Sequence, residues 1–164
     1  MPTYIKGNDT STFGGAITAN NVGAGNVLQV VNATFGTYVN TSSSTFSDLG
    51  LSATITPASA SSKILVTVFL TGAGKNVGNT SGKFKLLRGS TDILVFEGIL
   101  GYNNSAAGNY AATGTTYLDS PSTTSPITYK IQFASTANIL GVYVNDYTGG
   151  ATGNSTMTLM EIAG

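Results

Sequence analysis

Residues Leu51–Leu70 read LSATITPASASSKILVTVFL, and this stretch decides the fold. In LSATIT the apolar residues alternate with Ser and Thr, which is the period of two expected for a half-buried strand. Pro57 cannot donate a hydrogen bond to a sheet, and the residues from there to Ser62 are Pro, Ala and Ser only, a turn composition. We therefore predict a strand that ends near Pro57 and a small-residue corner that leads into a second strand.

The second strand, Lys63–Leu70, is the strongest apolar run in the chain. Ile64, Val66, Val68 and Leu70 share one face, and Leu65, Thr67 and Phe69 share the other. A strand that is apolar on both faces is expected to be central and covered on both sides, by a second sheet or by another subunit. We predict that the two strands form a hairpin in the core.

Further strands are expected from Val27 to the end of the chain, and no segment has helical periodicity. The predicted strands are Val27–Val31, a bent strand over Tyr38–Asn40 and Thr45–Asp48, a hairpin of Lys83–Arg88 with Thr91–Gly98, and then Thr115–Leu118, Ile127–Phe133, Asn138–Asn145 and Ser155–Ile162. In the hairpin, Phe84 and Leu86 are expected on one face of the first arm, and Ile93 and Val95 on one face of the second. Thr71–Gly82 and Ile99–Thr113 are read as loops. Eight or nine strands separated by Gly, Asn and Pro turns indicate an all-β antiparallel sandwich, and the long connections favour a jelly-roll-like form.

The first 25 residues differ in composition from the rest. They contain two glycine-rich points and few bulky side chains, so we predict an extended arm over residues 1–25 and a β-sandwich domain over 26–164. The side chains suited to anchoring the arm on a neighbouring protein are Tyr4, Ile5, Phe13 and Ile17. The alternative is a disordered terminus.

Charge is scarce throughout the chain. Only 9% of the residues are charged, against about 25% in an average protein, and seven basic residues balance seven acidic ones. This composition gives no electrostatic basis for binding nucleic acid or an anionic membrane surface. A neutral, charge-poor surface tends to associate, which favours a homo-oligomer or part of a larger assembly, although a monomer with a hydroxyl-rich surface is the alternative.

Targeting segments are not expected. The opening MPTYIKGNDT lacks an apolar stretch, so no signal peptide is predicted. No run approaches the ~18 apolar residues of a membrane span. We expect a complete product made in the cytoplasm.

The residues needed for catalysis are missing from the sequence. Without His and Cys, neither a Ser–His–Asp nor a Cys–His arrangement can form, and zinc-type sites lack their usual ligands. The seven carboxylates are scattered, mostly at turns. We predict a protein that is not an enzyme, with no cofactor and no metal site; a Ca²⁺ ion held by loop carbonyls near Asp146 is left open.

Tyrosines gather in the second half of the chain: Tyr102, Tyr110, Tyr117, Tyr143 and Tyr147. In loops, such side chains stack on sugar rings or fill a protein interface, whereas in a strand, as at Tyr143, a place in the core or on the sheet is expected. The pattern indicates a contact surface without identifying the partner.

Four segments together carry a family resemblance: SATITPASASSKILV (Ser52–Val66), FKLLRGSTDI (Phe84–Ile93), LDSPSTTSPITYKIQ (Leu118–Gln132) and the terminal TLMEIAG (Thr158–Gly164). They resemble a β-sandwich domain of virion proteins of tailed bacteriophages, found in phages of cyanobacteria and other aquatic bacteria, in tail-fibre tips and capsid-surface proteins. The resemblance covers about Val27–Gly164. Thr12–Val22, TFGGAITANNV, is also similar to linker repeats of phage fibres.

The resemblance implies a jelly-roll-like domain, usually trimeric and without catalytic residues. The short arm favours a capsid decoration, or cement, protein on the capsid exterior over a tail protein. Its partners would be its own copies, as a homotrimer, and the major capsid protein or other virion proteins. Leu65 and Phe69 would then contact a sister subunit around the threefold axis.

The alternative is a short tail fibre or spike that binds a host-surface receptor or glycan. The loops Ile99–Thr113 and Asp146–Asn154 would then carry recognition, with Tyr102, Tyr110 or Tyr147 as stacking platforms.

Overall fold

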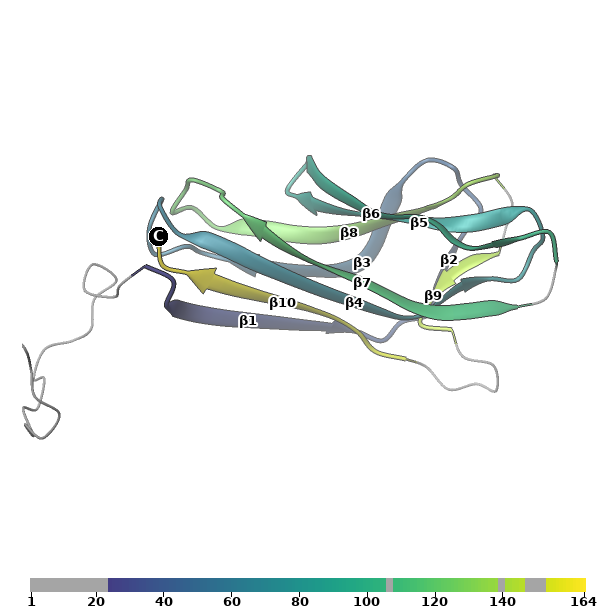
Figure 1. The fold of residues 1–164 in the computed structure, drawn as a ribbon, viewed down its shortest axis with the longest axis horizontal. Helices are drawn as coiled ribbons and strands as arrows, with labels where there is room; N and C mark the ends of the chain where they lie inside the picture. The colour runs from purple at the N-terminus through teal and green to yellow at the C-terminus, as the bar shows by residue number, and fades with distance from the viewer. Residues whose placement is uncertain (1–23, 106–107, 139–140, 147–152) are drawn as a thin grey trace, which may run out of the picture.

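The computed structural model describes residues 24–105, 108–138, 141–146 and 153–164, and these form two antiparallel sheets that face each other (Figure 1). The strands are β1 (Val27–Phe35), β2 (Val39–Thr41), β3 (Ser47–Ile55), β4 (Lys63–Lys75), β5 (Thr80–Arg88), β6 (Thr91–Asn103), β7 (Asn109–Asp119), β8 (Ile127–Ser135), β9 (Val142–Val144) and β10 (Ser155–Ile162). No described residue belongs to a helix. The described part of the chain therefore contains no helix that is long and apolar enough to cross a membrane. The predicted all-β sandwich is confirmed.

The order of the strands is that of a jelly roll. In the first sheet β10 lies between β1 and β4, β7 pairs with the other edge of β4, and the short strands β9 and β2 extend the sheet at one end. The second sheet has the order β3-β8-β5-β6. Among the eight long strands only β5 and β6 are joined as a hairpin within one sheet, while the other connections cross between the sheets.

The predicted core hairpin within Leu51–Leu70 is wrong, because β3 belongs to the second sheet and β4 to the first. Residues 56–62 are a corner between the sheets, and the two strands point their alternate apolar residues at each other across the core. The central position of β4 is confirmed, since β10 and β7 flank it. Its inward row, Ile64, Val66, Val68 and Leu70, is buried as predicted.

The predicted loops Thr71–Gly82 and Ile99–Thr113 are largely strand, because β4 and β6 run further than the hydrophobic pattern indicates. The glycines in this part of β4 mark close approach between backbones. A Cβ at Gly74 would meet the carbonyl of Asn109 on β7. Lys75 is fully buried, and its amine donates hydrogen bonds to the Asn103 side chain and the Ser105 carbonyl.

Two smaller expectations also need correction. Tyr38–Asn40 and Thr45–Asp48 do not form one bent strand, because β2 lies in the first sheet and β3 in the second. Ile93 and Val95 do not share the core face, because register shifts along β5–β6 place Val95 opposite the outward Lys85, where it is 59% exposed.

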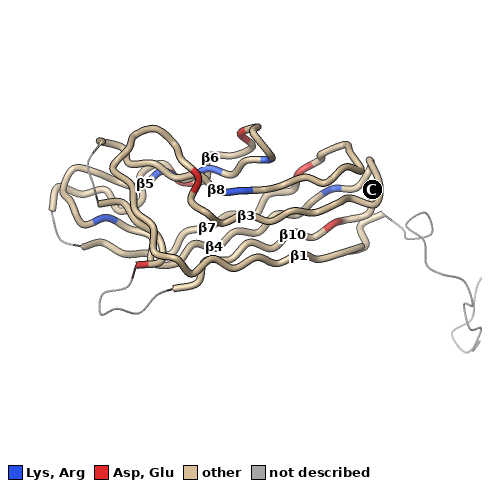
Figure 2. Tube along the Cα trace, turned by 180° about the vertical axis from the view of Figure 1, so that it is seen from behind, with Lys and Arg blue, Asp and Glu red and all other residues tan. Residues whose placement is uncertain are grey.

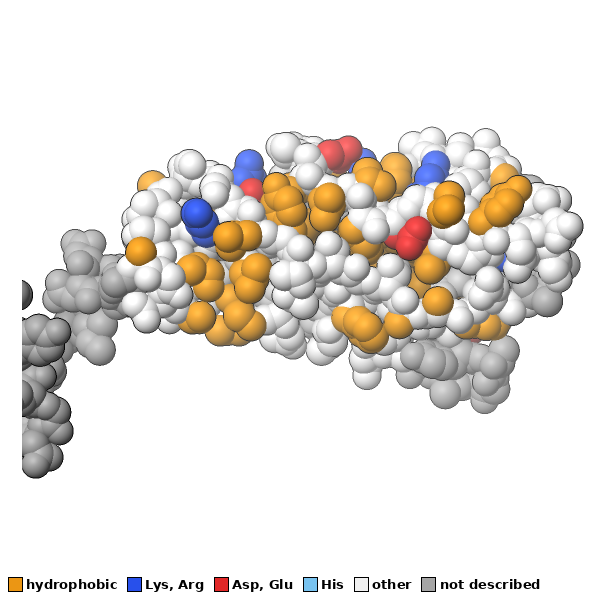
Figure 3. Space-filling view, viewed as in Figure 1, with side chains coloured by type: hydrophobic (Ala, Val, Ile, Leu, Met, Phe, Trp, Pro, Cys, Tyr) orange, Lys and Arg blue, Asp and Glu red, His pale blue; other side chains and the backbone are white. Residues whose placement is uncertain are grey.

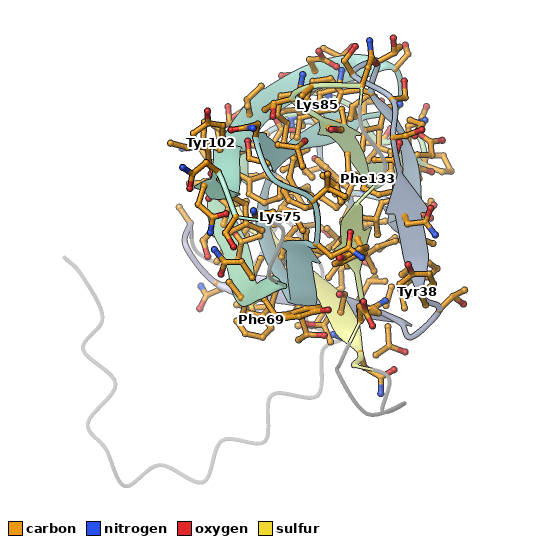
Figure 4. All side chains as sticks on the ribbon, turned by 90° about the vertical axis from the view of Figure 1, so that its right-hand side faces the viewer. Tyr38, Phe69, Lys75, Lys85, Tyr102 and Phe133 are labelled. Atoms are coloured by element: carbon orange, nitrogen blue, oxygen red, sulfur yellow. The ribbon has the colours of Figure 1, made fainter. Side chains whose placement is uncertain are left out.

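The core lies between the sheets and is filled from both. On β8, the predicted strand Ile127–Phe133 is confirmed, and every second residue, Tyr129, Ile131 and Phe133, is buried. Met157 and Leu159 of β10 meet this row from the opposite sheet. Figure 4 shows Phe133 between the two sheets.

Candidate interaction surface

The residues predicted to form a subunit interface lie on the outer face of the first sheet. Leu65 and Phe69 alternate with the buried row of β4, so their side chains point away from the core. Phe69 is 49% exposed, and Figure 4 shows it on the outside of the sandwich. Leu65 is half-buried by its neighbours in the sheet.

The register between strands places Leu65 in an apolar row that crosses four strands. Val30 of β1 pairs with Met160 of β10, Met160 with Leu65 of β4, and Leu65 with Leu118 of β7. Val27 and Ile162, a second facing pair, adjoin this row. We call these six residues, Val27, Val30, Leu65, Leu118, Met160 and Ile162, the outer apolar band. It lies toward the end of the sandwich that carries the C-terminus, where hydrophobic side chains gather in Figure 3.

A row of polar residues separates the outer apolar band from Phe69. It consists of Asn32, Thr158, Thr67 and Thr116. The Asn32 amide donates to the Thr158 hydroxyl at 2.9 Å. Phe69 lies in the next row, opposite Gly114, which has no side chain to cover its ring. The structure therefore places the two predicted interface residues on one face, in different rows.

This outer face is almost free of charge. Among the described strand residues of the first sheet, Lys63 is the only charged side chain that points outward, and Figure 2 shows few charged positions along β1, β10, β4 and β7. The second sheet carries exposed ion pairs, such as Lys130–Asp48 at 2.9 Å. Hydrogen bonds from Gln132 and Lys130 hold the pKa of Asp48 below its usual value. Within the described part of the chain, no three acidic residues converge on a metal site.

At the opposite end of the same face, three tyrosines form an aromatic ladder. The ring centroids of Tyr38 and Tyr143 are 6.2 Å apart, and those of Tyr143 and Tyr110 are 5.9 Å apart with nearly parallel planes. Gly74 pairs with both Tyr143 and Tyr110, and its missing side chain leaves room for their rings to stack. A cleft of about 300 Å³ adjoins the ladder and is lined by Tyr38, Asn40, Asn76, Val77, Gly141 and Tyr143.

The other predicted contact residues are dispersed or undescribed. Tyr102 lies on β6 in the second sheet and is 61% exposed, whereas Tyr110 lies on β7 in the first sheet. Tyr4, Ile5, Phe13, Ile17 and Tyr147 lie outside the described residues. Sequence reasoning missed most of the outer apolar band and the cleft. The one signal available was the second apolar row of β10, where Met160 and Ile162 alternate with the core residues.

Comparison with known proteins gives structural neighbours only. No family model matches the chain, and no curated protein sequence matches it. The fold is similar to that of a chain in the crystal structure of the infectious bursal disease virus VP2 subviral particle, with a TM-score of 0.52 and 12% identity. The match covers 99% of this chain and 38% of the VP2 chain. A chain from the structure of the Gt strain of the same virus is 12% identical over 85% of this chain and 38% of its own length, with a TM-score of 0.33.

The sequence identity and the coverage limit this likeness to the fold. At 12% identity the match to VP2 shows a shared β-sandwich fold over nearly the whole of this chain. The chain spans well under half the length of the VP2 chain.

Proposed function

We propose that this protein is a structural protein of a virus particle, a capsid decoration protein of a tailed bacteriophage that assembles as a homotrimer on the capsid exterior. The observation that carries the proposal is the charge-poor outer face of the first sheet with its exposed apolar band. Two likenesses support it: the resemblance of the sequence to phage virion domains, and the fold shared with a viral capsid protein.

Burial of the band would supply the energy of association. Val30 and Leu118 are each about half exposed, and full burial of such a side chain stabilises by about 1.5–3 kcal/mol relative to full exposure. Because charge is nearly absent from this face, covering it carries little cost of removing ions from water. A second copy of the chain is therefore a suitable cover.

The arm has a separate role in the proposal. Residues 1–25 form an extended arm beside the domain 26–164, and Tyr4, Ile5, Phe13 and Ile17 contact the major capsid protein or another virion protein. The last residue of the proposed arm, Gly25, adjoins the outer apolar band, because its backbone N–H donates to the Ala163 carbonyl at 2.8 Å, next to Ile162 of the band. Contacts to the capsid and contacts between copies would thus lie near the same end of the sandwich.

The number of copies in each virus particle tests this function. A decoration protein covers a symmetric shell, so quantitative gel electrophoresis of purified particles is expected to give hundreds of copies. A few copies to a few tens would contradict the proposal and support the alternative, a short tail fibre or spike that binds a host-surface receptor or glycan.

Phe69→Asp and Leu65→Asp are each expected to convert the trimer into a folded monomer. The new carboxylate points away from the core, so each variant keeps its fold. In the trimer, however, the interface would bury this carboxylate without a partner of opposite charge. Light scattering coupled to size-exclusion chromatography measures the mass, and thermal unfolding checks the fold.

Val95→Asp is the matched control, since Val95 is an exposed apolar residue on the second sheet. It should stay trimeric. If Phe69→Asp and Leu65→Asp also stay trimeric, this face is not the interface.

A further inference from the structure

The cleft beside the aromatic ladder has the size and the chemistry of a small ligand site. Its volume of about 300 Å³ is at the lower end of the range for ligand pockets, which suits one or two sugar rings. An aromatic ring, Tyr38, and two amide side chains, Asn40 and Asn76, line it, and none of the described lining residues is charged. Amides donate and accept hydrogen bonds at once, as neighbouring sugar hydroxyls do.

One polar group beside the cleft is poorly paired. The Tyr143 side chain is 2% exposed, and its hydroxyl lies near Tyr110 without a hydrogen bond of good geometry among the described residues. Buried polar atoms are usually paired, so a poorly paired one calls for a partner such as an ordered water. Burial raises the pKa of the Tyr143 phenol, which keeps the hydroxyl protonated and able to donate.

The walls of the cleft are held in place before any ligand binds. The buried Asn145 side chain donates to the carbonyls of Phe35 and Thr37 at 2.8 and 3.0 Å, which fixes the segment leading into Tyr38. On the other side the Asn76 backbone N–H donates to the Gly141 carbonyl at 2.9 Å. A preformed site loses less entropy on binding than one that must order itself.

We propose that this cleft binds a neutral saccharide. One C–H face of a sugar ring would stack on Tyr38, and its hydroxyls would hydrogen-bond to the amides of Asn40 and Asn76. A neutral sugar is favoured over an acidic one because no described residue that lines the cleft carries a positive charge. The site is centred on Tyr38 and not on Tyr102, which lies on β6 in the second sheet, and it applies equally to a protein on the head or on the tail.

Saturation-transfer difference NMR on the purified full-length chain tests the proposal, with glucose, galactose, mannose, N-acetylglucosamine and their β-linked disaccharides as probes at millimolar concentration. Signal is expected on the ring protons of at least one sugar. Tyr38→Ala should abolish it, because the stacking surface is removed. Gly141→Ala should weaken it strongly, because a Cβ there would meet the Asn76 side-chain oxygen at 2.6 Å.

Tyr102→Ala is the matched control, because it removes an exposed tyrosine outside the cleft. Its signal should equal that of the unaltered protein, and thermal unfolding should show all three variants folded. No signal with any probe would overturn the proposal, as would a signal unchanged in Tyr38→Ala. Because the measurement uses purified protein, its failure would leave the particle copy number, and so the proposed function, untouched.

Discussion

Phe84→Ala is expected to lower the free energy of unfolding by about 3–5 kcal/mol. Phe84 is fully buried on β5, and its ring lies 6.2 Å from that of Phe96 and 6.5 Å from that of Phe133, both nearly parallel to it. β5 is hydrogen-bonded to β8 on one side and β6 on the other, so the backbone cannot move in to fill the space that the ring leaves. Urea unfolding followed by circular dichroism measures the loss.

Phe69→Ala removes the same atoms from the outer face and is the matched control. Because Phe69 is half exposed, we expect a loss of about 1 kcal/mol or less when the protein is dilute enough to be monomeric. The dependence of the unfolding free energy on urea should be the same for both variants. Similar losses at the two positions would contradict a core that lies between the two sheets.

The strands themselves could be predicted where one face is apolar and the other polar. β8 is the clearest case, because apolar and polar residues alternate along Ile127–Phe133. This alternation can be read from neighbouring residues alone, and it is typical of a strand in a sheet with one buried face. The same reasoning located β10 and the inward row of β4. It failed beyond Leu70 and beyond Gly98, where glycines that permit close contact between strands look like loop residues in the sequence.

The partners of the strands could not be predicted, because they depend on distant contacts. A corner between two sheets and a hairpin within one sheet have the same local pattern, so the sequence predicts one hairpin where β3 and β4 lie in different sheets. The outer apolar band shows the same limit. Leu65 was recognised from its own strand, whereas Val30 and Leu118 join it only through the register of β1 with β10 and of β4 with β7. The cleft likewise depends on Tyr38 and Tyr143, which are far apart in the chain.

Glu161→Gln is expected to lower the free energy of unfolding at neutral pH by about 1.5–3 kcal/mol. Glu161 is fully buried at the end of β10, in the same inward row as Met157 and Leu159. Its carboxylate accepts hydrogen bonds from the Gln29 side chain at 2.6 Å and from the Ala58 backbone N–H at 2.7 Å, so it ties β1 and the corner 56–62 to β10. A glutamine keeps the shape but turns an N–H₂ group toward one of these donors.

The loss should depend on pH in a defined direction. Burial alone would raise the pKa of Glu161, but the hydrogen bond from Gln29 and those from residues of the corner 56–62 together outweigh it and hold the pKa below its usual value. The folded protein therefore holds this proton less tightly than the unfolded chain, in which a glutamate titrates near about 4.3. The stabilisation is fully present above that pH and is lost as the pH falls through the folded value.

Urea unfolding at neutral pH and at a series of acidic pH values tests this dependence. The difference in stability between the unaltered protein and Glu161→Gln should be largest at neutral pH and should shrink below about pH 4, because protonation removes from the native side chain the acceptor that glutamine lacks. Asp92→Asn, which alters an exposed ion pair with Lys85, should change stability by about 1 kcal/mol or less at neutral pH. A gap for Glu161→Gln that stays constant down to the acid transition would mean that the ionised carboxylate does not hold the corner.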